Sequence, residues 1–157
     1  MKSTVSKKAV LFDLDGVLLD SRPNMKFAWN EVRDCLGVTV NFEDYFKNIG
    51  RPFRDILEIL HLQDRADEIE SLYSQSSKDN FDLATFYPCV VESLKKIEKC
   101  GIKLGIVTSK DQERTKIILN RLPVKFSVVQ SPSSSFRGKP APDQLLAAMA
   151  ELNVDPI

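Results

Sequence analysis

The sequence predicts an α/β protein with a Rossmann-like, parallel three-layer α/β/α core and an inserted α-helical cap. Short apolar runs alternate with segments of helical periodicity near both ends of the chain, and a purely helical block separates them. Alternating strands and helices are typical of a parallel sheet with right-handed crossovers. With 157 residues, the chain is long enough to bury a core of this kind.

The first strand is predicted at 9–12, an apolar run that ends at Asp13-Leu14-Asp15-Gly16. Apolar residues closed by acidic residues and glycine indicate a buried strand that runs into a loop. Such a run fits a strand of a parallel sheet that is covered on both faces.

Residues 21–82 show helical spacing and no convincing strand. The first helix is expected to follow a cap at Ser21 or Asp20 and to end before Gly37. Further helices are expected at 42–49, 53–60 and 65–78. The predicted domains are therefore a core made of 1–19 and 84–157 and a helical cap at 20–83.

From residue 84 onward, predicted helices and strands alternate again. We expect five elements in this order: a helix at 90–97 that Gly101 ends, a strand at 102–107, a helix capped by Asp111, a strand at 124–129 and a last helix capped by Asp143. In open parallel sheets, ligands bind beyond the carboxyl ends of the strands. The polar residues at those ends are therefore the candidates for function.

Two aspartates follow the first strand, Asp13 and Asp15, and lie on similar sides of it. An Asp-x-Asp sequence alone fits a solvated turn equally well, but two close carboxylates also favour a cation such as Mg²⁺. Thr108 and Lys139 at neighbouring strand ends supply a hydroxyl and an ammonium, which together complete a phosphate site. Gly16 permits a turn and the close approach of backbone to a ligand.

Composition narrows the classes of partner. Lys+Arg and Asp+Glu number 22 each, so the chain lacks the excess of basic residues that is typical of proteins binding nucleic acid or an anionic membrane. The sequence contains no run of 18 apolar residues, so it does not predict a membrane-spanning helix. Cys35, Cys89 and Cys100 lack a metal-ligand pattern and are interpreted as structural thiols in a reducing cytosol. A cytoplasmic monomer or homodimer that binds a small phosphorylated metabolite is expected.

Three segments resemble the motifs of the haloacid dehalogenase superfamily, in the order of that family. They are Phe12-Asp13-Leu14-Asp15-Gly16-Val17-Leu18-Leu19-Asp20-Ser21, Gly101-Ile102-Lys103-Leu104-Gly105-Ile106-Val107-Thr108-Ser109-Lys110 and Gly138-Lys139-Pro140-Ala141-Pro142-Asp143. The second is preceded by Tyr87-Pro88-Cys89-Val90, in which Cys89 stands where these relatives usually have glycine. The resemblance spans nearly the whole chain.

The resemblance implies a role for each matching residue. Asp13 becomes the nucleophile and a Mg²⁺ ligand, and Asp15 the general acid/base, which also binds the metal through its backbone carbonyl. Thr108 binds the phosphoryl group and Lys139 stabilises its charge. The helical insert is similar to the cap of phosphoglycolate-phosphatase-like and β-phosphoglucomutase-like members. The implied function is a Mg²⁺-dependent phosphatase for a small phosphate monoester, acting through an aspartyl-phosphate, with a phosphomutase as the alternative.

Two further residues, Arg51 and Ser109, are assigned to substrate binding, and for each a purely structural role is the alternative hypothesis. Gly50-Arg51-Pro52 resembles the cap loop that reads the substrate, where Arg51 pairs with a second anionic group or is simply an exposed arginine at a helix start. Ser109 supplies a hydrogen-bond donor or belongs to the entry of the next helix, and the same two interpretations apply to Lys110, which is not included among the site residues.

The family's fourth motif, a strand that ends in an acidic pair, has no counterpart before Ile157. The resemblance then implies that the metal keeps Asp13 and the Asp15 carbonyl but lacks another carboxylate. It also implies that strand 9–12 becomes an uncovered edge. The expectation is a core incomplete at its C-terminal end, and a non-catalytic remnant of the fold is the competing hypothesis.

Overall fold

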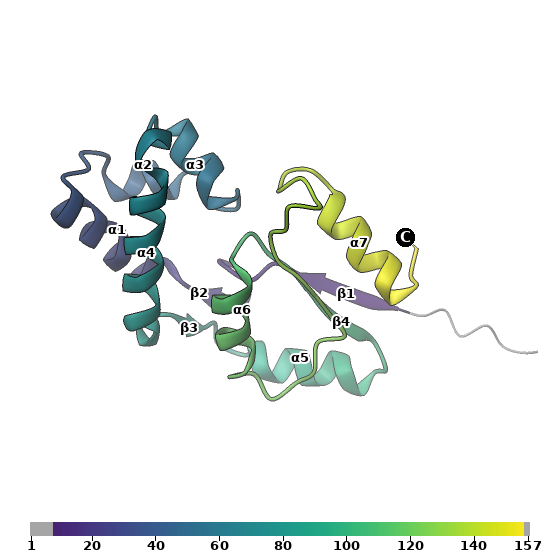
Figure 1. Cartoon of the computed structure of the whole chain (residues 1–157). Coiled ribbons are helices and arrows are strands. Elements are labelled where there is room, and N and C mark those ends of the chain that lie inside the picture. The colour runs from purple at the N-terminus through teal and green to yellow at the C-terminus, as the bar shows by residue number, and fades with distance from the viewer. Residues whose placement is uncertain (1–7, 156–157) are drawn as a thin grey trace, which may run out of the picture.

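A computed structural model describes residues 8–155 of the chain. The predicted core segments at 1–7 and 156–157 lie outside these residues. A helical part and a sheet-containing part lie side by side, joined by two strands (Figure 1).

Three parallel strands form the main sheet in the order β1-β4-β5. They are β1 (Ala9–Phe12), β4 (Lys103–Val107) and β5 (Val128–Gln130). Gly105 in the central strand pairs with Leu11 on one side and Val128 on the other. A Cβ at Gly105 would lie 2.6 Å from Val128 Cγ1, so only glycine fits between these side chains. Within residues 8–155, β1 is an edge strand, as predicted, and its residues are only half-buried.

Helices cover both faces of this sheet, which confirms the predicted three-layer α/β/α arrangement (Figure 1). Helices α5 (Val90–Lys99) and α6 (Gln112–Leu119) pack on the face that carries Leu104 and Ile106. Helix α7 (Asp143–Leu152) packs on the opposite face, against Val107 and Val128. The period of two along a strand sends alternate residues to the two layers.

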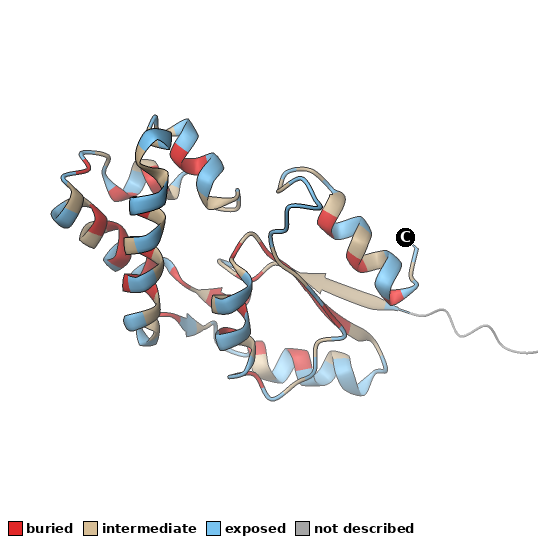
Figure 2. Ribbon diagram, viewed as in Figure 1, coloured by how far each residue is buried: buried red, intermediate tan, exposed pale blue. Residues whose placement is uncertain are grey.

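The helical part has a core of its own. It contains α1 (Arg22–Leu36), α2 (Phe42–Phe46), α3 (Phe53–Ile59) and α4 (Ala66–Asp79), with 3₁₀ turns at Gln63–Arg65 and Phe81–Leu83. Buried residues line the facing sides of these helices (Figure 2). Trp29 stacks on Tyr45 with ring centroids 4.3 Å apart, and Trp29 Nε1 donates to Val40 O.

Two short strands join the parts, β2 (Leu19–Asp20) and β3 (Thr85–Phe86), and they pair antiparallel. This ladder was not predicted from the sequence, because strands of two residues have no readable period. The predicted division of the chain at 19/20 and 83/84 remains a prediction; the separate packing of the two parts supports it.

Two predicted details are wrong. Strand β5 covers only Val128–Gln130, because Phe126 turns into the layer of α5 and α6 and Lys125 N donates to Glu98 Oε1 instead of a strand. Asp143 does not cap α7: its carboxylate accepts from the backbone and guanidinium of Arg137.

Cys89 occupies the left-handed region with φ 66° directly before α5. At this position, where the resemblance leads us to expect glycine, a residue that carries a Cβ adopts the left-handed turn at a conformational cost. All three cysteines are free and exposed, so the interpretation as structural thiols gains no support from packing. Among residues 8–155, each helix is too short or too polar to cross a bilayer.

Candidate active site

Asp13 and Lys139 meet beyond the carboxyl end of the sheet. Asp13 is the first residue after β1, and its Oδ1 accepts from Leu14 N at 2.7 Å. Lys139 Nζ lies 3.1 Å from Asp13 Oδ2 and donates to Val107 O at 2.9 Å. Because β1 and β4 are parallel neighbours, Asp13 and the end of β4 lie close together. The backbone therefore fixes an ammonium beside a carboxylate.

Thr108 follows β4 and is buried. Its backbone donates to Gln130 O at 2.9 Å, and its carbonyl accepts from the side chain of Gln144 at 3.4 Å. Thr108 Oγ1 accepts from Lys110 N at 3.1 Å. The hydroxyl hydrogen remains available for donation into the pocket that Asp13 also lines.

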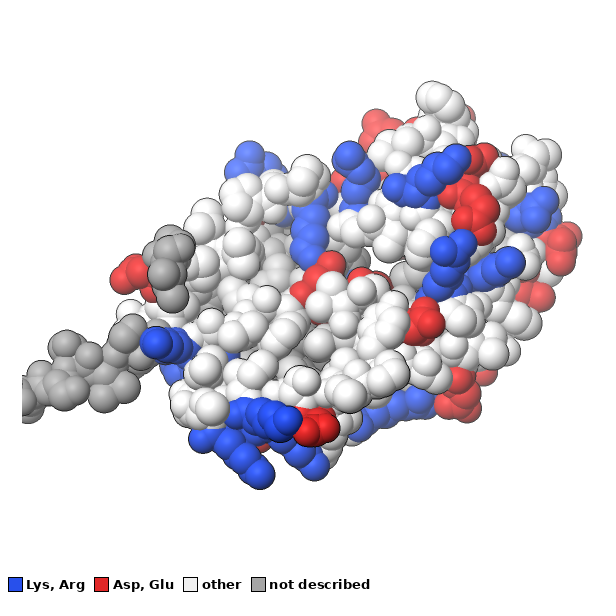
Figure 3. All heavy atoms as spheres, turned by 180° about the vertical axis from the view of Figure 1, so that it is seen from behind, with Lys and Arg blue, Asp and Glu red and all other residues white. Residues whose placement is uncertain are grey.

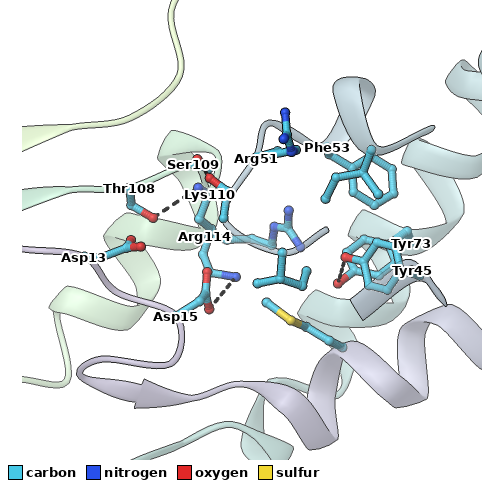
Figure 4. Close-up of a pocket in the computed structure, with 14 residues that line it drawn as sticks. Asp13, Asp15, Tyr45, Arg51, Phe53, Tyr73, Thr108, Ser109, Lys110 and Arg114 are labelled. Atoms are coloured by element: carbon cyan, nitrogen blue, oxygen red, sulfur yellow. Dashed lines mark hydrogen bonds and ion pairs between the residues drawn. The ribbon is translucent and has the colours of Figure 1, made fainter. Parts of the chain in front are cut away.

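Asp15 forms an ion pair with Lys110 at the wall of the pocket (Figure 4). Lys110 Nζ lies 3.3 Å from Asp15 Oδ1, and the lysine side chain is only 6% exposed. Burial lowers the pKa of Lys110, and the Asp15 carboxylate opposes this effect. From the sequence, Lys110 is interpreted together with Ser109 as a donor at the site or as part of the entry to the next helix, and it is not included among the predicted site residues.

The helical part supplies the opposite wall of the pocket. Tyr45 and Tyr73 face the aspartates, and their hydroxyl groups lie 2.9 Å apart (Figure 4). Burial raises the pKa of Tyr73 to about 12 and that of Tyr45 well above its usual range. Both phenols therefore stay neutral hydrogen-bonding groups. Tyr45 also belongs to the buried core of the helical part, so its helical spacing does not show that it lines the pocket, and neither tyrosine is among the site residues predicted from the sequence.

Arg114 of α6 connects the two walls. Its guanidinium forms an ion pair with Asp111, donates to Ser77 Oγ of α4 at 3.3 Å and lies 5.5 Å from the centre of the Tyr73 ring. The charge of Asp111 and its hydrogen bonds keep the pKa of Arg114 high, although burial opposes this. Seen from behind, acidic and basic side chains gather around the hollow between the two parts (Figure 3).

The remaining predicted residues are placed differently. Arg51 lines the pocket from the loop between α2 and α3. Ser109 also lines it, but its hydroxyl donates to Gly50 O at 2.7 Å. Gly16 is outside the pocket lining: it has φ 76°, and its N–H donates to Leu19 O at 2.8 Å. The structure therefore gives Gly16 a turn and no contact surface in the pocket.

The Asp13 carboxylate and the Asp15 carbonyl are hard oxygen donors of the kind that Mg²⁺ accepts. Asp15 Oδ1 is buried and its close neighbour is Lys110 Nζ at 3.3 Å, so the Asp15 side chain is already paired and the metal donor at this residue is its carbonyl. Residues 8–155 contain no group of three or more acidic, histidine or cysteine residues that would hold a metal alone. The donors fit Mg²⁺ that takes its other ligands from phosphate and water.

A parallel sheet with an acidic pair after its first strand, together with a helical insert over that strand end, places this chain among capped α/β proteins with a carboxylate-based site. The model of the haloacid dehalogenase-like hydrolase family matches residues 10–157. The chain belongs to this family, which confirms the resemblance and the predicted enzyme class.

Curated relatives cover most of the chain. A pyrophosphatase of Bacillus velezensis is 31% identical over 94% of this chain and 70% of its own length. A phosphorylated carbohydrates phosphatase of Thermotoga maritima is 30% identical over 95% of this chain and 72% of its own length. An N-acetylmuramic acid 6-phosphate phosphatase of Pseudomonas aeruginosa is 31% identical over 95% and 70%.

A solved structure shows the same architecture. A hydrolase from Pseudomonas syringae superposes with a TM-score of 0.84 at 25% identity, covering 95% of this chain and 71% of that one. The described fold is therefore that of the family's solved members.

Proposed function

We propose that this chain is a Mg²⁺-dependent phosphatase that hydrolyses a small phosphate monoester through a phosphorylated Asp13. The observation that supports it most is the Asp13–Lys139 pair, with Nζ and Oδ2 3.1 Å apart, next to a pocket into which buried Thr108 projects a free hydroxyl hydrogen. A carboxylate nucleophile with neighbouring donors for phosphoryl oxygens is the equipment that stepwise phosphoryl transfer needs.

In the proposed reaction, an Asp13 carboxylate oxygen attacks phosphorus, and the bond from phosphorus to the leaving oxygen breaks. Asp15 donates a proton to that oxygen and later removes one from the water that attacks the phosphorylated Asp13. Phosphate leaves and both carboxyl groups return to their starting states. Thr108 and Lys139 bind the phosphoryl oxygens throughout. The Asp13 carboxylate and the Asp15 carbonyl would hold Mg²⁺, which would supply further neutralisation of phosphoryl charge.

The names of the relatives support a small phosphorylated metabolite as substrate. They act on pyrophosphate, phosphorylated carbohydrates and N-acetylmuramic acid 6-phosphate. Arg51 at the rim of the pocket is suited to pair with a second anionic group on such a substrate. The cytoplasmic location and the monomeric or dimeric state stay predictions.

The test compares wild type with Asp13→Asn in Mg²⁺, using an aryl phosphate as a generic substrate. Loss of the nucleophile is expected to lower turnover by about 10³-fold or more, because asparagine cannot form the acyl phosphate. Removal of Mg²⁺ with a chelator is expected to abolish wild-type turnover, and added Mg²⁺ to restore it.

Equal rates for the two proteins would contradict catalysis by this chain and favour a remnant that binds phosphate without turnover. A mutase would instead accumulate a bisphosphate when it is given a sugar phosphate.

A further inference from the structure

The loop 50–52 of the helical part is held from two sides by the core. On one side, Ser109 Oγ donates to Gly50 O at 2.7 Å. On the other side, Gly138 faces the Pro52 ring: a Cβ at position 138 would overlap Pro52 Cγ and lie 3.1 Å from its Cδ. Gly138 does not have a positive φ. Its need for glycine therefore arises from the close approach of Pro52 alone.

Arg51 lies between these two contacts. Within residues 8–155, its guanidinium has no ion-pair partner, so its own side chain does not anchor it. Its N–H donates to Asn48 O at 3.4 Å, within a tight turn where Gly50 has φ 103°. The backbone of the loop therefore determines where Arg51 lies over the pocket.

The two holding residues are neighbours of the phosphoryl-binding residues. Ser109 follows Thr108, and Gly138 precedes Lys139. The same two core loops thus hold the proposed phosphoryl donors and the loop that carries Arg51. This arrangement ties the backbone position of the Arg51 loop to the position of the phosphoryl-binding residues.

We propose that Ser109 and Gly138 are positioning residues that clamp the loop 50–52 onto the core and so hold Arg51 for a second anionic group of the substrate. The role given to Arg51 rests on the proposed function; the clamp itself does not.

A double-mutant cycle tests the Gly138–Pro52 contact. The variants are Gly138→Ala, Pro52→Ala and the pair together, compared by kcat/KM for pyrophosphate and for an aryl phosphate. Gly138→Ala is expected to lower kcat/KM for pyrophosphate about tenfold, and that for the aryl phosphate less, because the overlap with Pro52 displaces the loop. In the Pro52→Ala background only the contact with the Cβ at 3.6 Å remains, so Gly138→Ala is expected to have little effect there.

An equal effect of Gly138→Ala in both backgrounds would overturn the clamp, because the cause would then lie at Lys139 or elsewhere. Hydrogen exchange of the segment 47–56 provides a readout that does not depend on turnover. Gly138→Ala and Ser109→Ala are each expected to accelerate its exchange, whereas exposed Ser134→Ala serves as the control.

Unchanged exchange in both variants would overturn the clamp even in an active enzyme. An inactive wild type with accelerated exchange in the variants would contradict the proposed function and leave the clamp supported.

Discussion

The two walls of the pocket are built in different ways. On the core side, backbone groups at strand ends hold the polar groups: Lys139 donates to Val107 O, and Thr108 Oγ1 accepts from Lys110 N. On the helical side, packing of aromatic rings holds the wall, as Tyr45 lies between Trp29 and Tyr73. Arg51 at the rim differs from both walls. Within the described residues, neither an ion pair nor ring packing holds its side chain in place.

This difference assigns separate tasks to the walls. A parallel sheet places groups at its strand ends with little dependence on side-chain packing, which suits chemistry that must stay the same. A wall built from a loop and packed rings accepts substitutions more easily, which suits the selection of different substrates. We therefore expect changes on the core side to affect all substrates and changes on the helical side to affect some.

The largest expected effect follows from Lys139→Met. Turnover should fall by about 10²–10³-fold for pyrophosphate and for an aryl phosphate alike, because the charge beside Asp13 is lost for every substrate. Steady-state kinetics on both substrates checks this. Lys103→Met is the matched control, since Lys103 also donates to a backbone carbonyl, that of Leu152, but is not part of the pocket. A loss of turnover for only one of the two substrates would contradict the assignment of the core side to chemistry that all substrates share.

Arg51→Ala should lower kcat/KM for pyrophosphate about tenfold and leave that for an aryl phosphate nearly unchanged, because only the former presents a second anion. The two kcat/KM values measure the change in selectivity. Arg54→Ala is the control: this neighbouring arginine pairs with Asp67 and Glu70 outside the pocket. An equal loss of kcat/KM for both substrates would show that Arg51 acts on the common phosphoryl group and not on a second anion.

The third prediction concerns pH. The Tyr73 pKa is raised from 10.0 to about 12 by burial, partly offset by the charge of Arg114. The folded chain therefore keeps this proton where the unfolded chain loses it, and the stabilisation is lost as the pH rises from about 10 to about 12. Urea unfolding at about pH 9 and pH 11 should show a smaller drop in stability for Tyr73→Phe than for wild type. The same drop in both proteins would contradict it.

The smallest expected effect is that of Cys89→Gly, outside the pocket. Removal of the Cβ at φ 66° should raise the free energy of unfolding by about 0.5–1 kcal/mol, because glycine adopts this region without a steric penalty. Chemical denaturation measures the change. Cys89→Ala keeps a Cβ and should not stabilise. Kinetic constants should stay at wild-type values, and a change in them would show that stability and selectivity are not separate here.

The sequence predicted the core side of the site well, because strand ends in a parallel sheet converge by geometry alone. Asp13 and Thr108 could be placed by counting from apolar runs, and Lys139 by its place in a motif. The roles of these residues remain proposals. Strand 124–129 was overestimated since an apolar run does not show where the backbone turns away from the ladder.

The helical side could be predicted only in outline. Its helices followed from periodicity, but the same periodicity marks Tyr45 as interior without showing that its hydroxyl meets Tyr73 near a cavity. Arg114 and Gly138 were missed, and for Lys110 the sequence did not distinguish a donor from a helix entry, because their contacts join residues far apart in the chain. Such contacts depend on how the two parts pack, which no local pattern contains.

The paired linkers β2 and β3 have a mechanical consequence. The two chain crossings between the helical part and the sheet are hydrogen-bonded to each other, with Leu19 opposite Phe86 and Asp20 opposite Thr85. One crossing therefore cannot shift along the other without loss of these hydrogen bonds. A substitution in either linker is expected to act on both connections at once.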